Sequence, residues 1–327
     1  MPELISVVTP CYHEEENVEH VYRLVKEVFA KLSQYRYEHI FIDNASKDKT
    51  VPILKSLAAK DRNLKIIVNT RNFGQIRSPY HALLQATGDA VIFLMADLQD
   101  PPELISVFIK EWEKGFKVVI GEKIASEESF VMKAIRKFYY TLTAHISDVE
   151  LYKNCTGFGL FDRDVVEAFR KIEDPYPYFR GLLAEFGFAA TKIPYKQPQR
   201  KHGKTKNNFY TLYDTALLGI TSHSKLPLRL VTMTGFIMSS ICLFIAFAYF
   251  IAKLLLWQYF TLGLAPIAIG LFFLGSVQLL FIGIIGEYLG FVYTQVLKRP
   301  LVIEKERINF DPVDVLSSKK ESTCSVQ

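Results

Sequence analysis

The amino-acid sequence predicts an α/β domain followed by a hairpin of two transmembrane helices. Over roughly the first two hundred of its 327 residues, short apolar strands alternate with segments of helical spacing, the pattern of a parallel sheet covered by helices. Further on, two long stretches contain no charged residue, Leu230 to Ala252 and Leu254 to Gly286. Each is long enough for a helix to cross the hydrocarbon core of a bilayer. The alternative is a buried helical hairpin in a soluble protein, where apolar stretches of this length are uncommon.

Each predicted element rests on the spacing of its apolar residues. Strands are predicted at Leu4 to Thr9, His39 to Asp43, Leu64 to Asn69, Ala90 to Met95, Lys117 to Gly121, Gly157 to Phe161 and Thr191 to Tyr195. Helices are predicted at Glu15 to Leu32, Val51 to Ala59, Pro79 to Ala86, Glu103 to Lys114, Met132 to Ile146 and Arg163 to Lys171. A further segment, Phe209 to Ser222, has an amphipathic face that lies either in the membrane interface or against the soluble domain.

The flanking charges predict how the chain lies in a membrane. Cations precede the first apolar stretch and follow the second, whereas the short connection between them holds only Lys253. Because cytoplasmic loops carry the excess of Lys and Arg, both termini are expected in the cytoplasm, in a multi-pass protein of the plasma (inner) membrane. The predicted organisation is a cytoplasmic domain at 1–208, an amphipathic juxtamembrane segment at 209–228, two transmembrane helices at 229–297 and a cytoplasmic tail at 298–327.

Composition argues against several other classes of protein. The amino terminus enters a strand pattern almost at once, so no signal peptide is expected. The four cysteines show neither paired nor metal-ligand spacing, and a cytoplasmic domain keeps them reduced. The net charge of +5 is modest and its cations gather near the apolar stretches, so a nucleic-acid partner is not needed to explain it.

The most informative segment is AVIFLMADLQDPPE, residues 90–103, where an apolar strand leads into Asp97 and Asp100 ahead of Pro101 and Pro102. Carboxylates just beyond the carboxyl end of a parallel strand stand where open α/β sheets bind their ligands. Mg²⁺ or Mn²⁺ commonly takes one or two such carboxylates and completes its shell with water and nucleotide diphosphate oxygens. The alternative is that Asp97 caps a loop and Asp100 opens a helix.

Polar residues also follow the first three predicted strands, and these loops are expected to converge on one edge of the sheet. Asp43 can accept the imide hydrogen of uracil, Tyr12 can lie along a base or ribose, and Gly74 permits close approach of the backbone to a ligand. In the alternative reading, Ser46 and Asp48 cap the following helix and 72–74 is a simple turn.

Two further patterns lie near the apolar stretches. The basic loop Lys196 to Asn208 either clamps a phosphate or binds anionic lipid headgroups, and the two roles are compatible. In the second stretch, Gly283, Gly286 and Gly290 beside Glu287 allow a close helix contact that is compatible with a homo-oligomer.

Several motifs now stand in a recognisable order: VVTPCYHEEENV, IDNASKDKT, TRNFGQ, ATGDAVIFLMADLQDPPE, the basic loop, PLR at 227–229, GIIGEYLG and KRP at 298–300. This order resembles the polyisoprenyl-phosphate glycosyltransferases of family 2, the relatives of dolichyl-phosphate mannose synthase that keep two carboxy-terminal membrane helices. The resemblance covers roughly Leu4 to Ile303. Because separate motifs match in order, it is more specific than any one of them.

The resemblance implies a GT-A (Rossmann-like) domain that moves a sugar from a nucleotide diphosphate sugar, UDP-linked by the pattern of the relatives, to a polyprenyl phosphate with inversion at the anomeric carbon. By motif position, Asp97 would contact Mg²⁺ or Mn²⁺ on the diphosphate, and Gln99 and Asp100 would lie toward the sugar. The substrate-binding residues implied in the same way are Pro10, Tyr12, Glu14, Asp43, Asn72, Gly74 and the basic-loop residues Arg200, Lys204 and Lys206.

The chain departs from the family pattern at two places. Members often carry a second Asp where this chain has Met95, and Gly-Asp-Phe-Arg-Leu where it has Thr-Gly-Phe-Gly-Leu at 156–160. A polyprenyl phosphate oxygen is already anionic, so a general base is dispensable, whereas charge on the departing diphosphate still needs a metal ion or cations. We therefore give Gly157 no catalytic role.

Two other functions were weighed. A processive polysaccharide synthase is disfavoured because only two spans are predicted and the Gln-x-x-Arg-Trp motif is missing. A catalytically impaired relative that binds nucleotide sugar is suggested by Met95 and Gly157.

Overall fold

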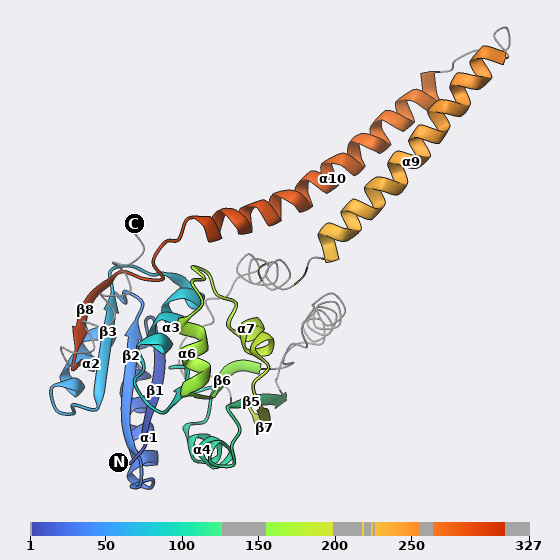
Figure 1. The fold of residues 1–327 in the computed structure, drawn as a ribbon. Coiled ribbons are helices and arrows are strands. Elements are labelled where there is room, and N and C mark those ends of the chain that lie inside the picture. Colours follow the sequence, from blue (N-terminus) through green and yellow to red (C-terminus); the bar gives the residue numbers. More distant parts are fainter. Residues whose placement is uncertain are drawn as a thin grey trace, which may run out of the picture. The chain divides into compact units, whose positions relative to one another are not determined.

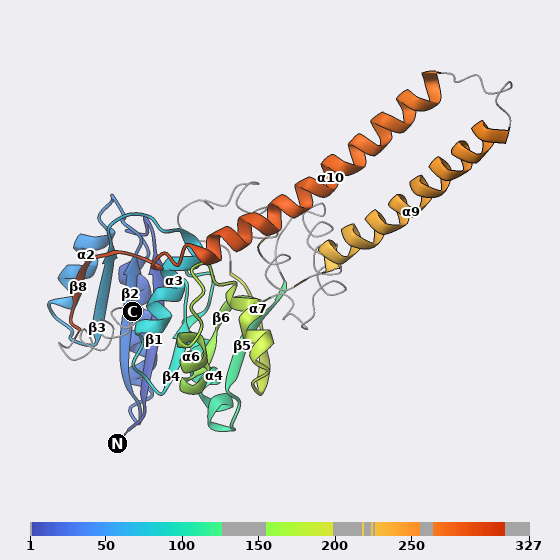
Figure 2. The same ribbon diagram turned by 45° about the horizontal axis from the view of Figure 1, so that its top comes forward.

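The structure is a computed structural model that describes residues 2–125, 155–198, 218, 224, 226–255 and 264–310. The chain divides into two units. The first consists of Met1–Phe138, Leu151–Phe209 and Lys298–Gln327, and the second of Tyr139–Glu150 and Tyr210–Leu297. The first unit holds a sheet with helices on both faces, and the second holds two long helices (Figures 1 and 2).

The sheet of the first unit has the strand order β7-β5-β6-β4-β1-β2-β3-β8. Its strands are β1 Leu4–Cys11, β2 Arg36–Asp43, β3 Leu64–Asn69, β4 Ala90–Phe93, β5 Val118–Ala125, β6 Cys155–Asp162, β7 Ala190–Lys196 and β8 Glu304–Ile308. The four strands β4, β1, β2 and β3 are parallel to one another, so their carboxyl ends meet at one edge. The predicted α/β class is confirmed, and the central parallel strands carry it.

The sheet is mixed rather than parallel throughout, because β6 and β8 run antiparallel to their neighbours. β6 pairs antiparallel with both β4 and β5, and β8 pairs antiparallel with β3. Since Glu122 pairs with Cys155, β6 begins at the end of the sheet where β5 finishes. Alternation of strands with helical patterns shows that crossovers exist but does not show the direction of each strand.

Helices cover both faces of the sheet. One face packs against α1 Val18–Ala30, α2 Thr50–Ala58 and α4 Ile105–Glu113, which follows the short 3₁₀ turn η1 Pro102–Leu104. The other packs against α3 Gly74–Gln85, α6 Arg163–Arg170 and α7 Phe179–Phe186. Neighbouring residues of β1 illustrate the two layers, because Val7 packs on the first face and Val8 on the second, both fully buried. Burial on both faces explains why the central strands are nearly continuous apolar runs.

Several predicted boundaries differ from the observed ones. α3 begins at Gly74, five residues before the predicted start at Pro79, which lies inside the helix. Proline favours the first turn of a helix, but Pro79 stands in the second turn of α3. β4 ends at Phe93 rather than Met95, and α7 was not predicted. The predicted helix Met132 to Ile146 lies outside the described residues.

The second unit contains α9 Leu226–Leu255 and α10 Leu264–Val296. In the described residues one segment, Phe273–Val296, is long and apolar enough to cross a membrane, and Leu226–Cys242 is a shorter apolar helix. The predicted second span, Leu254 to Gly286, is shifted, because Leu254 and Leu255 belong to α9 and α10 continues to Val296. An apolar run without charges does not mark where one helix ends and the next begins. Of the amphipathic segment 209–228, most residues lie outside the described ones.

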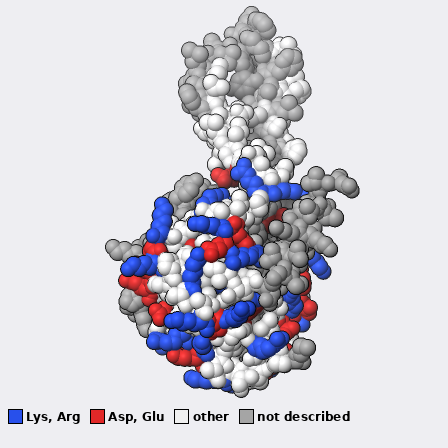
Figure 3. Space-filling view, turned by 90° about the vertical axis from the view of Figure 1, so that its left-hand side faces the viewer, with Lys and Arg blue, Asp and Glu red and all other residues white. Residues whose placement is uncertain are grey.

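The segment after α10, predicted as part of a tail, returns to the sheet as the edge strand β8 (Figure 1). Thr70 donates its backbone N–H to the carbonyl oxygen of Ile303 at 2.9 Å, and Asn309 donates its side-chain amide to the carbonyl oxygens of Ala58 and Leu64 at 2.9 and 2.8 Å. Charges of both signs are interspersed over this side of the first unit (Figure 3), and an ion pair between Lys55 and Glu306 at 2.6 Å is an example.

Glu304 of β8 fixes this return through contacts with His81 and Arg307. Its Oε1 lies 2.5 Å from Nε2 of His81 on α3, and Arg307 donates to both of its oxygens. Arg307 also donates to Oε1 of Gln85 at 2.7 Å. Burial opposes ionisation of Glu304, yet the hydrogen bonds from His81 and Arg307 outweigh it and lower its pKa to about 2.

Replacing Glu304 by Gln is expected to destabilise the first unit in a pH-dependent way. Because the folded-state pKa lies below the ordinary 4.5, ionised Glu304 stabilises the fold above that pH and the stabilisation is lost as the pH falls toward 2. We expect Glu304→Gln to lower the free energy of unfolding by ~1–3 kcal/mol at neutral pH, with a difference that narrows below pH 4.5. Thermal unfolding of the full chain in detergent measures it.

The matched control is Glu173→Gln, which removes an ion pair with Lys298 whose partners are both largely exposed. Such a pair contributes little, so its loss should leave the melting temperature nearly unchanged. Equal melting temperatures for Glu304→Gln and the wild type at neutral pH would show that β8 does not depend on this carboxylate.

Candidate functional site

The side chain of Asn44, buried just after β2, joins two strand ends to the start of α3. Its Nδ2 donates to Oδ1 of Asn72 at 3.0 Å and to the carbonyl oxygen of Gly74 at 3.1 Å. Its Oδ1 accepts from the backbone N–H of Phe73 at 2.9 Å and from Nδ2 of Asn69 at 3.2 Å. An asparagine side chain has two donors and two acceptor positions, so Asn44 uses all of them within the protein. Its role is to hold the turn that presents Asn72 and Gly74.

Gly74 leaves space beside its backbone. It has φ of +87°, and a Cβ built on it would meet nothing within 4 Å. The backbone N–H of Gly74 donates to Oδ1 of Asn72 at 2.8 Å. A glycine is therefore required here by the backbone conformation, and the open space permits the close ligand approach predicted for this turn.

Asp43 ends β2 and has no exposed surface. It accepts a hydrogen bond from the backbone N–H of Ser46 at 2.9 Å, and the thiol of Cys11 lies 3.9 Å from its Oδ1. Burial raises the pKa of Asp43, and hydrogen bonds from Ser46 and Ala45 act against that rise. In this conformation Asp43 shapes the turn after β2, and direct contact with a ligand requires that turn to open.

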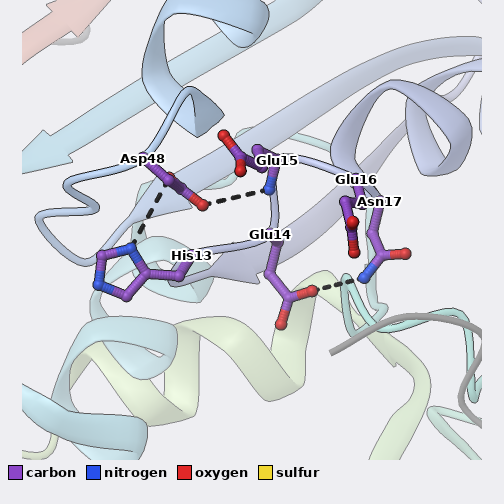
Figure 4. A pocket seen from close by; sticks show the side chains of 6 residues that line it. All are labelled: His13, Glu14, Glu15, Glu16, Asn17 and Asp48. Atoms are coloured by element: carbon purple, nitrogen blue, oxygen red, sulfur yellow. Dashed lines mark hydrogen bonds and ion pairs between the residues drawn. The ribbon is translucent and has the colours of Figure 1, made fainter. Parts of the chain in front are cut away.

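The loops after β1 and β2 are tied together and form an acidic pocket (Figure 4). The backbone N–H of His13 donates to Oγ of Ser46 at 2.8 Å, and that of Glu14 donates to Oγ1 of Thr50 at 3.0 Å. The carboxylate of Glu14 accepts from the side chain of Asn17 at 2.6 Å. The pocket is lined by His13, Glu14, Glu15, Glu16, Asn17 and Asp48. Its carboxylates suit hydroxyl or N–H donors of a ligand and repel phosphate groups.

Backbone strain gathers at this edge of the sheet. Three non-glycine residues have left-handed backbone angles here, His13 with φ of 57°, Ala45 with φ of 64° and Leu98 with φ of 59°. They follow β1, β2 and β4 respectively. Each such conformation costs roughly 1–2 kcal/mol, and strain of this kind collects at functional sites. The strain therefore marks the same edge as the polar side chains.

Asp97 lies in the loop after β4 and is half-buried. Its Oδ1 accepts a hydrogen bond from the backbone N–H of Gln99 at 3.2 Å. This contact is of the loop-capping kind that the alternative interpretation of the sequence expects. Within the described residues no three His, Cys, Asp or Glu side chains gather closely enough to hold a metal ion by themselves. A metal ion at Asp97 would therefore depend on oxygens from outside the protein.

Asp100, close to Asp97 in the same loop, is only 2% exposed. Its Oδ1 accepts a hydrogen bond from the hydroxyl of Tyr195 on β7 at 2.7 Å. Burial raises the pKa of Asp100 to about 6, against the opposing effect of the Tyr195 hydrogen bond, and the charge of Asp97 raises it further. A buried carboxyl with a raised pKa beside a second carboxylate is a feature of functional sites rather than of helix starts.

The structure brings most of the predicted site residues to one edge. Pro10 and Asp43 lie at the carboxyl ends of β1 and β2, and Gly74 begins α3. Those that lie on the loops after β1, β3 and β4 are Tyr12, Glu14, Asn72, Asp97, Gln99 and Asp100. The basic-loop residues Arg200, Lys204 and Lys206 lie outside the described residues. The structural roles of Asn44 and Tyr195 were not predicted from the sequence. No local pattern signals the Tyr195 contact, because its partner is 95 residues away.

The departure from the family pattern at 157–159 is built into β6. A Cβ on Gly159 would lie 2.4 Å from the carbonyl oxygen of Val119 in the adjacent strand β5. Gly157 has φ of +101°, an angle that side-chain-bearing residues rarely adopt. Neither the family's Arg nor its Asp fits these two positions without movement of the backbone. β5 and β6 therefore approach each other closely at Gly159.

A mixed α/β sheet with polar side chains gathered beyond its parallel strands is the fold class of the GT-A glycosyltransferases. Comparison with known sequences agrees, because residues 6–170 match glycosyl transferase family 2. The chain belongs to this family and is a glycosyltransferase.

Relatives match over nearly the whole chain. An uncharacterised glycosyltransferase of Synechocystis sp. is 36% identical over 300 residues, which cover 91% of this chain and 94% of that protein. The prophage bactoprenol glucosyl transferase homolog of Escherichia coli is 34% identical and covers 92% of this chain and 98% of its own length. The bactoprenol glucosyl transferase of Shigella phage SfII is 34% identical over 309 residues, 94% of this chain and 99% of that protein.

Replacing Gly159 by Ala is expected to destabilise the sheet strongly. The new methyl group would meet the backbone of Val119 at 2.4 Å, and backbone cannot move aside as a flexible side chain can. We expect a loss of more than about 3 kcal/mol in unfolding free energy, or no folded protein. Gly74→Ala is the comparison, because it meets open space and costs only ~1–2 kcal/mol from its backbone angle. Similar melting temperatures for the two variants would contradict the close β5–β6 approach.

Replacing Asp100 by Asn is expected to stabilise the protein above pH 6. Because the folded-state pKa lies above the ordinary 3.8, the protonated carboxyl stabilises the fold at low pH, and this contribution is lost as the pH rises through about 6. Asparagine keeps an acceptor for Tyr195 without a buried charge. We expect the free energy of unfolding of the variant to exceed that of the wild type by ~1–3 kcal/mol at pH 8, and this difference to disappear near pH 4. Melting curves at both pH values measure it, and a variant that is less stable at pH 8 contradicts the buried charge.

Proposed function

We propose that this glycosyltransferase moves a sugar from a UDP-linked donor to a polyprenyl phosphate at the cytoplasmic face of a membrane, with inversion at the anomeric carbon. The observation that carries the proposal is the match to the bactoprenol glucosyl transferase of Shigella phage SfII over 94% of this chain and 99% of that protein. That match extends well past residue 170, where the family domain ends. It therefore includes the part of the chain that holds the two apolar helices.

The nucleoside is proposed to bind where the loops after β1 and β2 meet. Tyr12 follows β1 with its ring 4.2 Å from that of His13, measured between centroids, and Glu14 lines the acidic pocket. The pocket's acceptors suit ribose hydroxyls and base N–H groups, and its negative charge directs phosphate groups away from it. Pro10 and Asp43 support this region from the strand ends. Asn72 and Gly74 are proposed to approach the donor from the loop after β3.

The donor set at Asp97 fits a magnesium-type ion. Such an ion accepts one or two protein carboxylates and takes its other oxygens from a diphosphate and water, which agrees with the lack of a three-residue cluster in the described chain. Asp97 would hold the ion, Mg²⁺ or Mn²⁺. When bound, such an ion stabilises negative charge on a departing diphosphate.

The remaining requirements fall on the chain's own residues. Asp100, fixed by Tyr195, holds the loop that carries Asp97. Gln99 and Asp100 are proposed to lie toward the sugar. The acceptor phosphate carries no proton to remove, so the missing family carboxylate at Gly157 does not block the reaction. Arg200, Lys204 and Lys206 are proposed to align the acceptor, because Arg offers a bidentate fork and Lys a point charge to phosphate.

A membrane anchor brings the enzyme to its lipid acceptor. We propose that α9 and α10 both span the inner membrane, with the α/β domain and both termini cytoplasmic. Two observations support this proposal. Phe273–Val296 has the length and composition of a transmembrane span. Apolar side chains of α9 are exposed, and Phe236, for example, is 71% exposed.

Sugar transfer by the purified full chain tests the proposal. Labelled UDP-glucose and other nucleotide sugars are incubated with undecaprenyl phosphate and Mg²⁺ or Mn²⁺, and lipid-linked product is extracted. We expect a monosaccharide on the lipid, lost on chelation. Nucleotide binding without product would favour the impaired relative, and long polymer would favour a polysaccharide synthase.

Asp97→Asn tests the proposed metal role. Because a neutral amide is a weak ligand for a hard cation, we expect kcat to fall by about 100-fold or more without loss of folding. Asp164→Asn is the matched control, since that aspartate is exposed on α6 and 66% of its side chain is accessible. Unchanged turnover in Asp97→Asn would remove this residue from the reaction.

A further inference from the structure

Two arginines flank one aromatic ring at the start of α3. The guanidinium carbon of Arg71 lies 4.1 Å from the ring centroid of Phe73, and that of Arg77 lies 5.5 Å from it. Phe73 itself is only 7% exposed. Contact with an aromatic face holds a guanidinium plane while leaving its N–H groups directed outward. The start of α3 therefore fixes two cations in position.

A third arginine joins them from the segment after α10. Arg77 donates a hydrogen bond to the carbonyl oxygen of Pro300, the residue after Arg299. Burial lowers the pKa of Arg77, and the charges of Arg71 and Arg299 lower it further. The geometry that joins them is the shared ring of Phe73 for Arg71 and Arg77, and the hydrogen bond from Arg77 to the residue after Arg299. We call these three residues the arginine cluster.

The arginine cluster lacks anionic partners in the described part of the chain. No described acidic side chain pairs with any of the three, and the adjacent Lys298 is paired with Glu173 at 3.4 Å. The Nε of Arg77 is buried without a hydrogen-bond partner. The amino-terminal end of α3 adds the positive end of a helix dipole. Like charges held together in this way are unfavourable unless an anion offsets them.

Chain connectivity limits where the cluster can be. α10 ends at Val296, and Arg299 follows three residues later, so its Cα is within about 11 Å of the last helical residue. If Phe273–Val296 crosses the bilayer, that end of the helix lies at the polar interface. The headgroup layer on each side is roughly 5–8 Å thick. Arg299 is thus tethered within reach of lipid phosphates.

We propose that Arg71, Arg77 and Arg299 form a phosphate-binding site whose ligand is the headgroup phosphate of an anionic membrane lipid. The proposal rests on the membrane anchoring proposed above but not on the glycosyl transfer. Guanidinium groups bind phosphate oxygens in bidentate fashion. Arg71 and Arg77 flank one ring here, and Arg299 precedes the residue that Arg77 bonds. Because the backbone N–H of Phe73 donates to Asn44, a lipid bound at the cluster also restrains the turn at Asn72 and Gly74. Lipid binding would then stabilise the edge of the candidate active site.

Lipid retention by the full chain tests the site without any sugar donor. The protein is purified in detergent, exposed to mixed phosphatidylglycerol and phosphatidylcholine, and analysed by native mass spectrometry for bound lipid. Arg71→Gln and Arg299→Gln are the variants, because both side chains are exposed and their loss should not disturb folding. We expect phosphatidylglycerol retention to weaken by about five-fold for each arginine removed, with phosphatidylcholine unaffected. Arg62→Gln, an exposed arginine of the α2–β3 connection, is the matched control and should retain lipid normally.

Competition identifies the source of the phosphate. Excess inorganic phosphate should displace part of the bound phosphatidylglycerol. UDP at the same phosphate concentration should displace no more phosphatidylglycerol than inorganic phosphate does. Stronger displacement by UDP would assign the cluster to the nucleotide and overturn the lipid proposal, as would equal retention by wild type and variants. Alkaline carbonate extraction of membranes distinguishes failure of the proposed membrane anchor from failure of the proposed lipid site. A protein released by carbonate contradicts the anchor, and one that stays in the membrane without selective retention contradicts only the cluster.

Discussion

The backbone N–H of Phe73, a buried residue just before α3, must find a hydrogen-bond partner, and the side chain of Asn44 supplies it. An apolar residue at position 44 would leave this N–H without that partner, at the cost of its desolvation. Because Asn44 is saturated, it fixes the turn after β3 without competing for a ligand. The candidate site thus depends on a residue that does not face the substrate.

The edge of the sheet separates its charges by position. Glu14 and its acidic neighbours line the pocket beyond β1 and β2, while Arg71 and Arg77 flank Phe73 beyond β3. Asp97 and Asp100 lie beyond β4. A ligand with a polar neutral end and an anionic end is therefore oriented before any specific contact forms, because the acidic pocket repels the anionic end. Burial of Asp100 in this arrangement raises its pKa, and the hydrogen bond from Tyr195 reduces that rise.

The sequence was sufficient for the central strands and for the edge at which they end, because each strand is a buried apolar run followed by polar residues. It was insufficient where structure depends on distant partners. The direction of β6 follows from its pairing with β5, and β8 exists because Glu304 and Asn309 meet α3 and the α2–β3 connection. A polar segment such as EKERI carries no apolar pattern to mark it as a strand. The convergence of the loops beyond the parallel strands was predictable from the strand pattern, whereas the burial of Asp43 was not.

The return of the chain after α10 connects these features. An edge strand at β3 would expose unpaired backbone groups, and β8 covers them with a short, charged strand of the kind that resists further pairing. The ion pairs of Glu304 hold that strand against α3, whose first turn contributes Arg77. The start of α3 also presents the turn held by Asn44, and its Arg77 bonds the carbonyl oxygen of Pro300. Within the first unit, the segment at 298–310 is therefore joined to the candidate site by named hydrogen bonds.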